Sequence, residues 1–236
     1  MIKIIKREIY ALTKYIYFWF YNHGFCSYAN KSYSQEGEDQ ILRRIFNGKK
    51  DGFYVDVGAF HPKRFSNTFA LYKLGWQGIN IEPNPEILPL FKKNRPRDLN
   101  LCLGIGLNRE KINYFMLNDA ALNTFDKKVL NNHISKKVYK YIKTISIEIK
   151  PLAEVLIENI PKNKRIDFFS IDTEGFDLNV LKSNDWNAFR PDWVLVEKLN
   201  LNSIENLNFE IHHYMKSLRY VLFAKTFNTL FYKSEI

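Results

Sequence analysis

The stretch from Phe53 to Glu82 constrains the fold more than any other part of this chain. It contains a strand-like run, FYVDVGAF, a helix-compatible segment, and a second strand-like run, GINIEP. Asp56 lies in the first run, Gly58 lies at its turn, and Glu82 ends the second run twenty-six residues beyond Asp56. This order is typical of a βαβ unit that holds a nucleoside, because the glycine lets the backbone approach a ligand and the carboxylate accepts hydrogen bonds from ribose hydroxyls. We therefore expect an adenosine-containing cofactor.

The composition of the turn indicates which cofactor. A dinucleotide-binding loop offers G-x-G-x-x-G, so that backbone amides at a helix N-terminus receive a pyrophosphate. Here the turn reads Gly58-Ala59-Phe60-His61-Pro62, which is too bulky for a pyrophosphate. S-adenosylmethionine carries a sulfonium and an amino-acid tail and no phosphate, so one glycine and a nearby carboxylate such as Asp56 suit it better. The alternative interpretation is an ordinary βαβ crossover with a tight turn.

Length and composition favour one enzyme-sized α/β domain. The 236 residues are 46% hydrophobic and 16% aromatic, which is enough to bury a large core. Two cysteines, Cys26 and Cys102, cannot build a disulfide scaffold or a cysteine zinc site. A reducing cytoplasm is the simplest compartment for such a chain.

Residues 1–30 predict a helical extension before a domain at 31–236. The extension is basic and aromatic, and its apolar run Tyr15–Tyr21 is far shorter than the roughly 20 residues that cross a bilayer. One interpretation is an amphipathic helix at an anionic membrane surface, which makes the protein peripheral at the inner membrane face. The residues facing lipid are then Lys3, Lys6, Arg7 and Lys14 together with Tyr15, Phe18 and Trp19.

Other interpretations of this extension remain open. The helix can pack its aromatic face on the domain, or on a second subunit in a homo-oligomer. A cleaved signal peptide is a further alternative, for which the apolar run is short and aromatic instead of leucine-rich.

Strand-like and helix-like segments alternate along the rest of the chain. A helix with Ser34 as its N-cap is expected to stop near Gly48. The apolar runs Ile166–Ile171 and Trp193–Val196 are typical of strands buried on both faces of a parallel sheet. Further strands are expected at 99–105, 112–117 and 145–149, helices at 151–159, 178–181 and 204–218, and an antiparallel hairpin around Phe227-Asn228.

Five motifs together resemble the FkbM family of S-adenosylmethionine-dependent methyltransferases. They are SQEGEDQIL (34–42), FYVDVGAFHP (53–62), SNTFALYKLGWQGINIEPNP (66–85), FFSIDTEGFDLNVL (168–181) and WVLVE (193–197). The resemblance covers about residues 32–233 in the family's order and spacing. It implies a class I, Rossmann-like sheet of seven mostly parallel strands with an antiparallel last strand and helices on both faces. It also implies O-methylation of hydroxyls on sugars, polyketides or related metabolites.

The resemblance further assigns site residues. Asp56 and Gly58 fall on the cofactor loop, Glu82 is the ribose acid, and Asp172-Thr173-Glu174-Gly175 is the family's D-x-E-G element. The full set expected to contact the cofactor is Glu36, Asp56, Gly58, Ala59, Glu82, Pro83 and Asp172. The pair His61-Pro62 departs from the family, since many relatives have a smaller, glycine-containing turn there.

Acidic residues at the ends of predicted parallel strands point to the catalytic chemistry. They are Asp56, Glu82, Asp172 and Glu197, which converge in the crevice where such a sheet binds ligands. Repulsion between carboxylates raises a pKa towards the range useful for base catalysis. Methyl transfer to a hydroxyl needs the acceptor oxygen about 3 Å from the methyl and a group that removes its proton. We expect Asp172 to be this base and Glu174 to position the acceptor, with His61 as the alternative base.

A divalent metal offers a second scheme for the same step. Asp172 with Glu197 or Glu174 can hold Mg²⁺, which would lower the pKa of chelated sugar hydroxyls. A purely structural interpretation also exists for Glu174 and Gly175, as a capped helix start, and Asp177 is expected to be an N-cap.

The net charge of +10 indicates an acidic partner. Lysines are frequent in the segment 118–143, which we interpret as a substrate-facing lid. Candidate substrates are nucleotide-activated sugars and the sugars of capsules or glycolipids. We therefore expect an O-methyltransferase of surface-polysaccharide or glycolipid synthesis that works in the cytoplasm. No role is expected for His133, His212 or His213.

Two other functions are carried as alternatives. An RNA or DNA methyltransferase would suit the charge, but an N-methylase would be expected to show Asn/Asp-Pro-Pro-aromatic where this chain has Asp172-Thr173-Glu174-Gly175. The other alternative is a non-catalytic binding module that keeps the fold.

Overall fold

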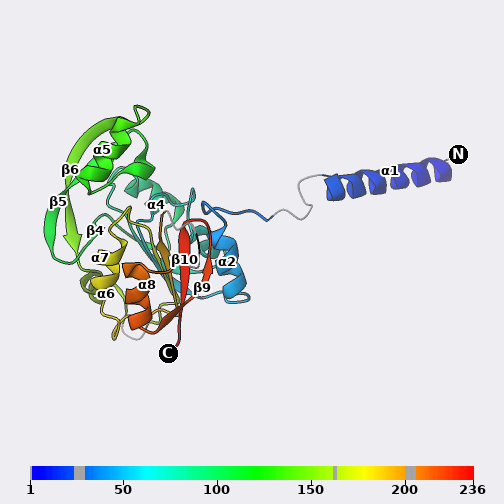
Figure 1. Ribbon diagram of the computed structural model, residues 1–236. Coiled ribbons are helices and arrows are strands. Elements are labelled where there is room, and N and C mark those ends of the chain that lie inside the picture. Colours follow the sequence, from blue (N-terminus) through cyan, green and yellow to red (C-terminus); the bar gives the residue numbers. More distant parts are fainter. Residues whose placement is uncertain (1, 24–29, 162–163, 200–202, 204–205) are drawn as a thin grey trace. The chain divides into compact units, whose positions relative to one another are not determined.

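The computed structural model describes residues 2–23, 30–161, 164–199, 203 and 206–236. The chain divides into two compact units, Met1–Ser32 and Tyr33–Ile236. The first unit contains α1 (Ile2–His23), and the second contains the remaining elements labelled in Figure 1. Cys26 lies outside the described residues. None of the described helices is long and apolar enough to cross a membrane.

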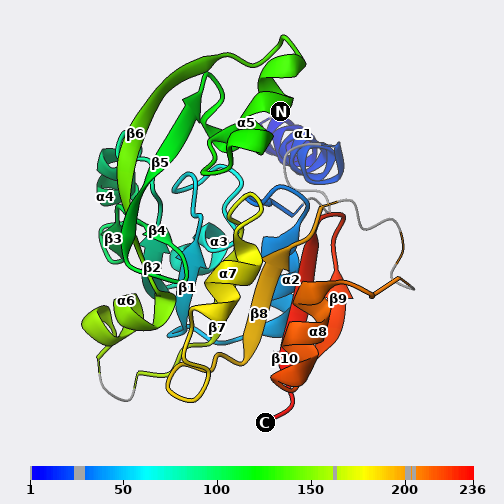
Figure 2. The ribbon, with the colours of Figure 1, turned by 60° about the vertical axis from the view of Figure 1, so that its left-hand side comes forward.

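In the described part of the chain, seven strands form one sheet in the order β3-β2-β1-β7-β8-β10-β9. The strands are β1 (Phe53–Val57), β2 (Gln77–Ile81), β3 (Leu99–Leu101), β7 (Phe168–Ile171), β8 (Trp193–Glu197), β9 (Tyr220–Lys225) and β10 (Thr229–Ser234). The first five are parallel, whereas β10 is antiparallel to both of its neighbours. The sheet, seen in Figure 2, confirms the expected class I arrangement with its antiparallel last strand.

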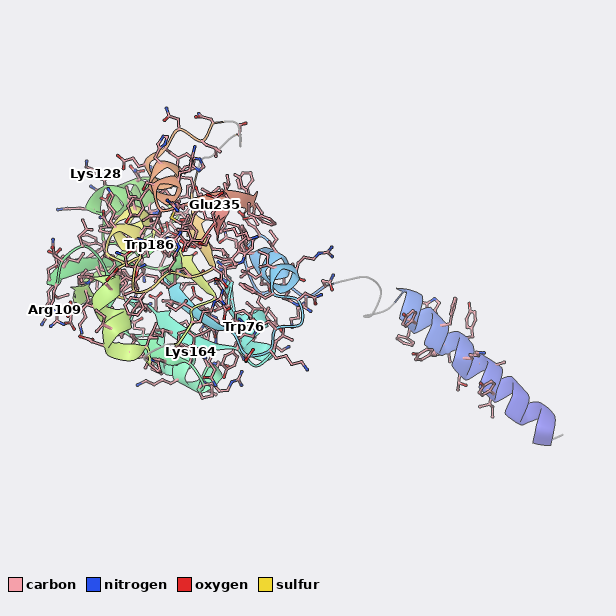
Figure 3. The ribbon with its side chains drawn as sticks, turned by 90° about the horizontal axis from the view of Figure 1, so that it is seen from below. Trp76, Arg109, Lys128, Lys164, Trp186 and Glu235 are labelled. Atoms are coloured by element: carbon pink, nitrogen blue, oxygen red, sulfur yellow. The ribbon has the colours of Figure 1, made fainter. Side chains whose placement is uncertain are left out.

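Helices cover both faces of this sheet because its side chains alternate between two hydrophobic clusters. Val55 belongs to the cluster that packs with the helices in front of the sheet in Figure 2, and Tyr54 belongs to the cluster behind it. Figure 3 labels one tryptophan from each cluster, Trp186 and Trp76. The front helices are α6 (Leu152–Asn159), α7 (Asp177–Lys182) and α8 (Glu210–Ser217), and α2 (Glu38–Ile45) and α3 (Phe69–Lys73) lie behind. The helix α4 (Leu88–Asn94) connects β2 to β3.

A second, three-stranded sheet stands apart from the first in the described ranges. Its strands are β4 (Gly104–Ile105), β5 (Glu110–Leu117) and β6 (Tyr141–Lys150), and η1 (Ala120–Leu122) and α5 (Lys127–Ser135) lie between β5 and β6. The expected strand at 99–105 is therefore split between two sheets. The expected strands at 112–117 and 145–149 pair with each other, because Tyr114, Met116, Ile147 and Ile149 bury a small apolar cluster of their own. Figure 1 shows this β5–α5–β6 insertion at one end of the fold.

Three helix starts differ from the expectation. α2 begins at Glu38 after Gly37, whose φ of 90° is left-handed, so Ser34 is not the N-cap, although its Oγ accepts a 3.2 Å hydrogen bond from the Asp39 N–H. α8 begins at Glu210, and residues 204 and 205 of the expected helix lie outside the described residues. Asp177 is the first residue of α7 and not its N-cap, yet its carboxylate accepts hydrogen bonds from the backbone of the preceding loop.

Candidate active site

One cavity of the second unit opens at the carboxyl ends of β1, β2, β7 and β8. It has a volume of about 330 Å³, within the range of small-molecule sites. Its wall includes Gly58 after β1, Glu82 after β2, Asp172 after β7 and Glu197 at the end of β8. The structure thus brings three of the four strand-end acids into one space, at the position where open parallel sheets bind ligands.

Gly58 has a conformation and a neighbour that exclude other residues. Its φ is +77°, and a Cβ atom at this position would lie 1.7 Å from the carbonyl oxygen of Asp172. Its N–H donates a 2.9 Å hydrogen bond to the carbonyl of Ile81, so the turn is attached to the neighbouring strand as well. The glycine therefore serves the close approach of β1 to β7, in addition to any approach to a ligand.

Glu82 is held rigidly at the cavity wall. One carboxylate oxygen accepts a 2.8 Å hydrogen bond from the Phe60 N–H and the other accepts a 2.8 Å hydrogen bond from the Asn84 N–H. Burial, which exceeds the effect of these hydrogen bonds, raises the pKa of Glu82 to about 7. Each oxygen keeps a second lone pair, so the side chain can still accept hydrogen bonds from a ligand.

Three carboxyl groups form an acidic cluster at the other side of the cavity. Asp172, Glu174 and Glu197 each offer an oxygen, and these oxygens lie within 4.8 Å of one another. Desolvation by the surrounding protein, followed by repulsion from the charges of Glu197 and Glu174, raises the pKa of Asp172 well above its usual value. The side chain still lines the cavity, through which solvent reaches it. The pKa of Glu197 rises to about 8 and that of Glu174 to about 7, mainly by burial. A hydrogen bond also joins Asp172 to Glu197, so the pair is suited to hold a proton between two strands.

The same cluster is the candidate metal centre of the second scheme. Carboxylate oxygens are the ligands that Mg²⁺ prefers, and three of them within 4.8 Å are compatible with one divalent cation. Glu174 has a left-handed φ of 50°, which directs it towards Asp172 and Glu197. Metal binding here stays a prediction.

Asp56 is not among the described residues that line the cavity. In β1 the side chain of Asp56 points to the face of the sheet opposite to that of Val55 and Val57. On that face its carboxylate accepts a 2.8 Å hydrogen bond from Thr68 Oγ1. Thr68 Oγ1 also accepts a 3.0 Å hydrogen bond from the buried Arg95 guanidinium. Asp56 therefore supports the loops beneath the cavity, and the structure gives no basis for the expected direct contact with the cofactor.

Two more of the expected cofactor contacts are absent from the described cavity wall. Glu36 accepts hydrogen bonds of 2.7 and 3.0 Å from the backbone and side-chain amides of Asn228, and the wall contains Gln35 and Asn228 instead. Ala59 is buried under the turn and donates a 3.2 Å hydrogen bond to Ile81. Pro83, the remaining expected residue, does line the cavity.

His61 faces a second cavity, which shares Phe60 with the first. Its Nδ1 accepts hydrogen bonds of 3.0 and 2.9 Å from the N–H groups of Lys63 and Arg64, so the neutral ring carries its proton on Nε2. Burial and then the charges of Arg64 and Lys63 lower the pKa of His61. The one lone pair of the neutral ring, on Nδ1, is therefore engaged by the backbone, which argues against a role of His61 as the alternative base.

The insertion supplies further wall residues, of which Tyr114 and His133 were not assigned to the site from the sequence. Tyr114 comes from β5, Asn123 follows η1, and His133 lies on α5. Asn123 Oδ1 accepts a 2.8 Å hydrogen bond from Leu117, and its buried Nδ2, which interacts with the Tyr114 hydroxyl, has no close hydrogen-bond partner within the described ranges. Such an orphaned donor at a cavity wall fits a ligand that brings an acceptor. Asn123 and His133 bring the segment 118–143 to the cavity wall, and its role as a lid stays a prediction. Phe65, with a left-handed φ of 58°, lies in the wall as well.

Comparison with known proteins gives a family match. The sequence model of the methyltransferase FkbM domain matches residues 56–222, which is well over half of the chain. No curated protein sequence matches significantly. Among solved structures, a TehB-like SAM-dependent methyltransferase from Corynebacterium glutamicum is 10% identical with a TM-score of 0.43, over 94% of this chain and 97% of that chain. An O-methyltransferase from Bacillus cereus, solved in complex with SAH, is 12% identical with a TM-score of 0.37, over 86% of this chain and 82% of that chain.

Proposed function

This chain belongs to the methyltransferase FkbM family, and on that premise we propose that it transfers a methyl group from S-adenosylmethionine to a hydroxyl of a sugar. The observation that carries the proposal is a single cavity in which Glu82 lies across from the cluster of Asp172, Glu174 and Glu197. We further propose that this reaction belongs to surface-polysaccharide or glycolipid synthesis and takes place in the cytoplasm.

The residues of the cavity fit S-adenosylmethionine. Glu82 accepts hydrogen bonds from the ribose hydroxyls through the lone pairs that Phe60 and Asn84 leave available. The orphaned Nδ2 of Asn123 donates to an acceptor of the ligand. When bound, the cofactor supplies an electrophilic methyl group on a positively charged sulfonium. A cation fits this cavity because three crowded carboxyl groups otherwise repel one another.

The acidic cluster then performs the proton chemistry. A nearby positive charge stabilises the ionised form of Asp172, whose pKa is otherwise far above the usual value of an aspartate. Ionised Asp172 accepts the proton of the acceptor hydroxyl as the new bond forms, and Glu197 shares that proton through its hydrogen bond to Asp172. Glu174 lies beside both and orients the acceptor hydroxyl.

The choice of a sugar is supported by the family's association with hydroxyl methylation and by the insertion. Segment 118–143 carries Lys127, Lys128, Lys136, Lys137, Lys140 and Lys143, and it contributes Asn123 and His133 to the wall of the cavity. The positive charge of this segment attracts anionic acceptors such as nucleotide-activated sugars or phosphorylated glycans.

A transfer assay with tritiated methyl groups tests this function. The assay offers S-adenosylmethionine with sugar nucleotides, purified surface glycans and bulk RNA in separate reactions. Label in a sugar fraction supports the proposal. Label in RNA alone would instead favour a nucleic-acid methyltransferase, and cofactor binding without transfer to anything would favour a non-catalytic module.

A further inference from the structure

Helix α1 carries different side chains on different faces. Ile9, Leu12 and Ile16 recur at three- and four-residue spacing and form an apolar stripe, and they are 57%, 60% and 45% exposed. Tyr10, Lys14, Tyr17 and Tyr21 share another face at the same spacing. The helix is thus amphipathic, with a hydroxyl-rich and basic side next to an aliphatic side.

Residues 15–21 of α1 are aromatic or aliphatic around the whole circumference of the helix. Residues 15–21 read YIYFWFY, and seven successive residues cover nearly two turns of a helix. Tyr15, Tyr17, Phe20 and Tyr21 are 66%, 71%, 54% and 58% exposed. Tyrosine and tryptophan combine an apolar ring with a polar atom, which suits a boundary between apolar and aqueous phases.

The charge of α1 is strongly positive. Its sequence contains Lys3, Lys6, Arg7 and Lys14 against the single acid Glu8, so the formal charge of residues 2–23 is 4 − 1 = +3. The basic residues precede the aromatic run. Lysine and arginine near a bilayer bind anionic headgroups, while their stems lie along its apolar surface.

We propose that α1 binds the surface of an anionic lipid bilayer and holds the enzyme at the membrane. A second copy of the chain is the competing occupant, because the stripe of Ile9, Leu12 and Ile16 could form a helix–helix seam. Such a seam would leave Tyr15, Tyr17 and Tyr21 in water, since they lie on other faces of the helix. A bilayer surface accommodates both the stripe and the tyrosines, and it also complements the charge.

Vesicle sedimentation of the full-length protein tests the charge contribution. We expect the protein to sediment with POPC:POPG (3:1) vesicles and much less with POPC alone. Lys6→Gln/Lys14→Gln should weaken partitioning into the anionic vesicles about 25-fold, since each basic residue contributes about fivefold. Lys128→Gln/Lys136→Gln is the matched control, because it removes two exposed lysines from the insertion (Lys128 is labelled in Figure 3) and should leave partitioning nearly unchanged.

A second pair of variants tests the apolar contribution. Ile9→Ser/Ile16→Ser should weaken partitioning at least about tenfold, because two apolar side chains no longer enter the interface. Leu107→Ser/Ile157→Ser, at positions 48% and 68% exposed in the second unit, is its control. Melting temperature and binding of S-adenosylhomocysteine are measured for every variant, to separate unfolding from loss of lipid binding.

The proposal is overturned if the wild-type protein sediments with neither vesicle, or if α1 variants and control variants partition equally. It is also overturned if light scattering finds a dimer without lipid that Ile9→Ser/Ile16→Ser converts to a monomer while vesicle binding is absent. That result would assign the stripe to a second copy of the chain. These outcomes are independent of which acceptor is methylated.

Discussion

Gly58 and Asp172 contact each other backbone to backbone where β1 and β7 end. The missing side chain of Gly58 is what allows the contact, since a Cβ would lie 1.7 Å from the Asp172 carbonyl oxygen. The Asp172 N–H donates a 3.0 Å hydrogen bond to Val57 at the same point. The proposed base is therefore positioned by the turn after β1, which also lines the cavity.

Gly58→Ala is expected to destabilise the protein by about 2–4 kcal/mol, because it combines a left-handed φ with a steric clash against rigid backbone. Urea unfolding measures the change in the free energy of unfolding. Gly175→Ala is the matched control, since its φ is +100° but a Cβ there meets no atom within 4 Å, and it should cost only about 1 kcal/mol. Equal losses in the two variants would contradict the close contact.

Glu82→Gln is expected to weaken binding of S-adenosylhomocysteine about 10- to 100-fold, because a charged acceptor of the ribose hydroxyls becomes a neutral one. Isothermal titration calorimetry measures the affinity. Glu86→Gln, which removes an exposed carboxylate paired with Lys143, should leave the affinity unchanged. Unaltered affinity in Glu82→Gln would remove Glu82 from the ribose site.

The ligand-free protein is expected to lose stability as the pH rises from about 5 to 8. The pKa values of Glu82 and Glu174 are raised to about 7 and that of Glu197 to about 8, so the folded state binds more protons than the unfolded state in this window. For Glu82 alone the raised pKa corresponds to about 3 kcal/mol. Urea unfolding at several pH values measures the slope, and Glu82→Gln should flatten it. Stability that rises with pH would contradict these shifts.

Asp172→Asn is expected to lower turnover at least about 100-fold while the affinity for S-adenosylhomocysteine stays within a few-fold, because the variant keeps the shape and loses the base. Turnover is measured by methyl transfer, and Asp192→Asn, at a partly exposed carboxylate paired with Arg165, is the control. An active Asp172→Asn enzyme would exclude Asp172 as the base.

Treatment with EDTA is expected to leave turnover unchanged, because Asp172 and Glu197 can hold the transferred proton without a metal. The measurement is methyl transfer before and after chelation, with Mg²⁺ added back. Activity that is lost and then restored by Mg²⁺ would instead make Asp172, Glu174 and Glu197 its ligands.

The order of strand-like and helix-like segments in the sequence was sufficient to predict the seven-stranded sheet. It also predicted that Glu82, Asp172 and Glu197 lie at the same cavity. These residues end strands whose apolar runs are continuous, and parallel strands end at one edge. Asp56 was expected at the cavity, yet it lies on the opposite face of the sheet. Strand alternation contained this signal, since Val55 and Val57 flank Asp56 and point the other way.

The contributions of the insertion were not predictable from local pattern. Tyr114 and His133 enter the wall because β5 pairs with β6 across the 23 residues 118–140. That pairing depends on register between distant segments, which composition does not encode. The same holds for Asn228, which lines the cavity and donates hydrogen bonds to Glu36, a residue 192 positions earlier in the sequence.

Strand β10 lies between β8 and β9, although it is synthesised after both. During translation, β8 is therefore an open edge with unpaired backbone groups until β10 leaves the ribosome, and β9 has no sheet to join. The cavity wall includes Glu197 at the end of β8 and Asn228 in the turn before β10. This part of the wall is therefore complete only after β10 has paired with β8. A chain that lacks β10 thus exposes the unpaired backbone groups of β8, at which another extended segment can pair.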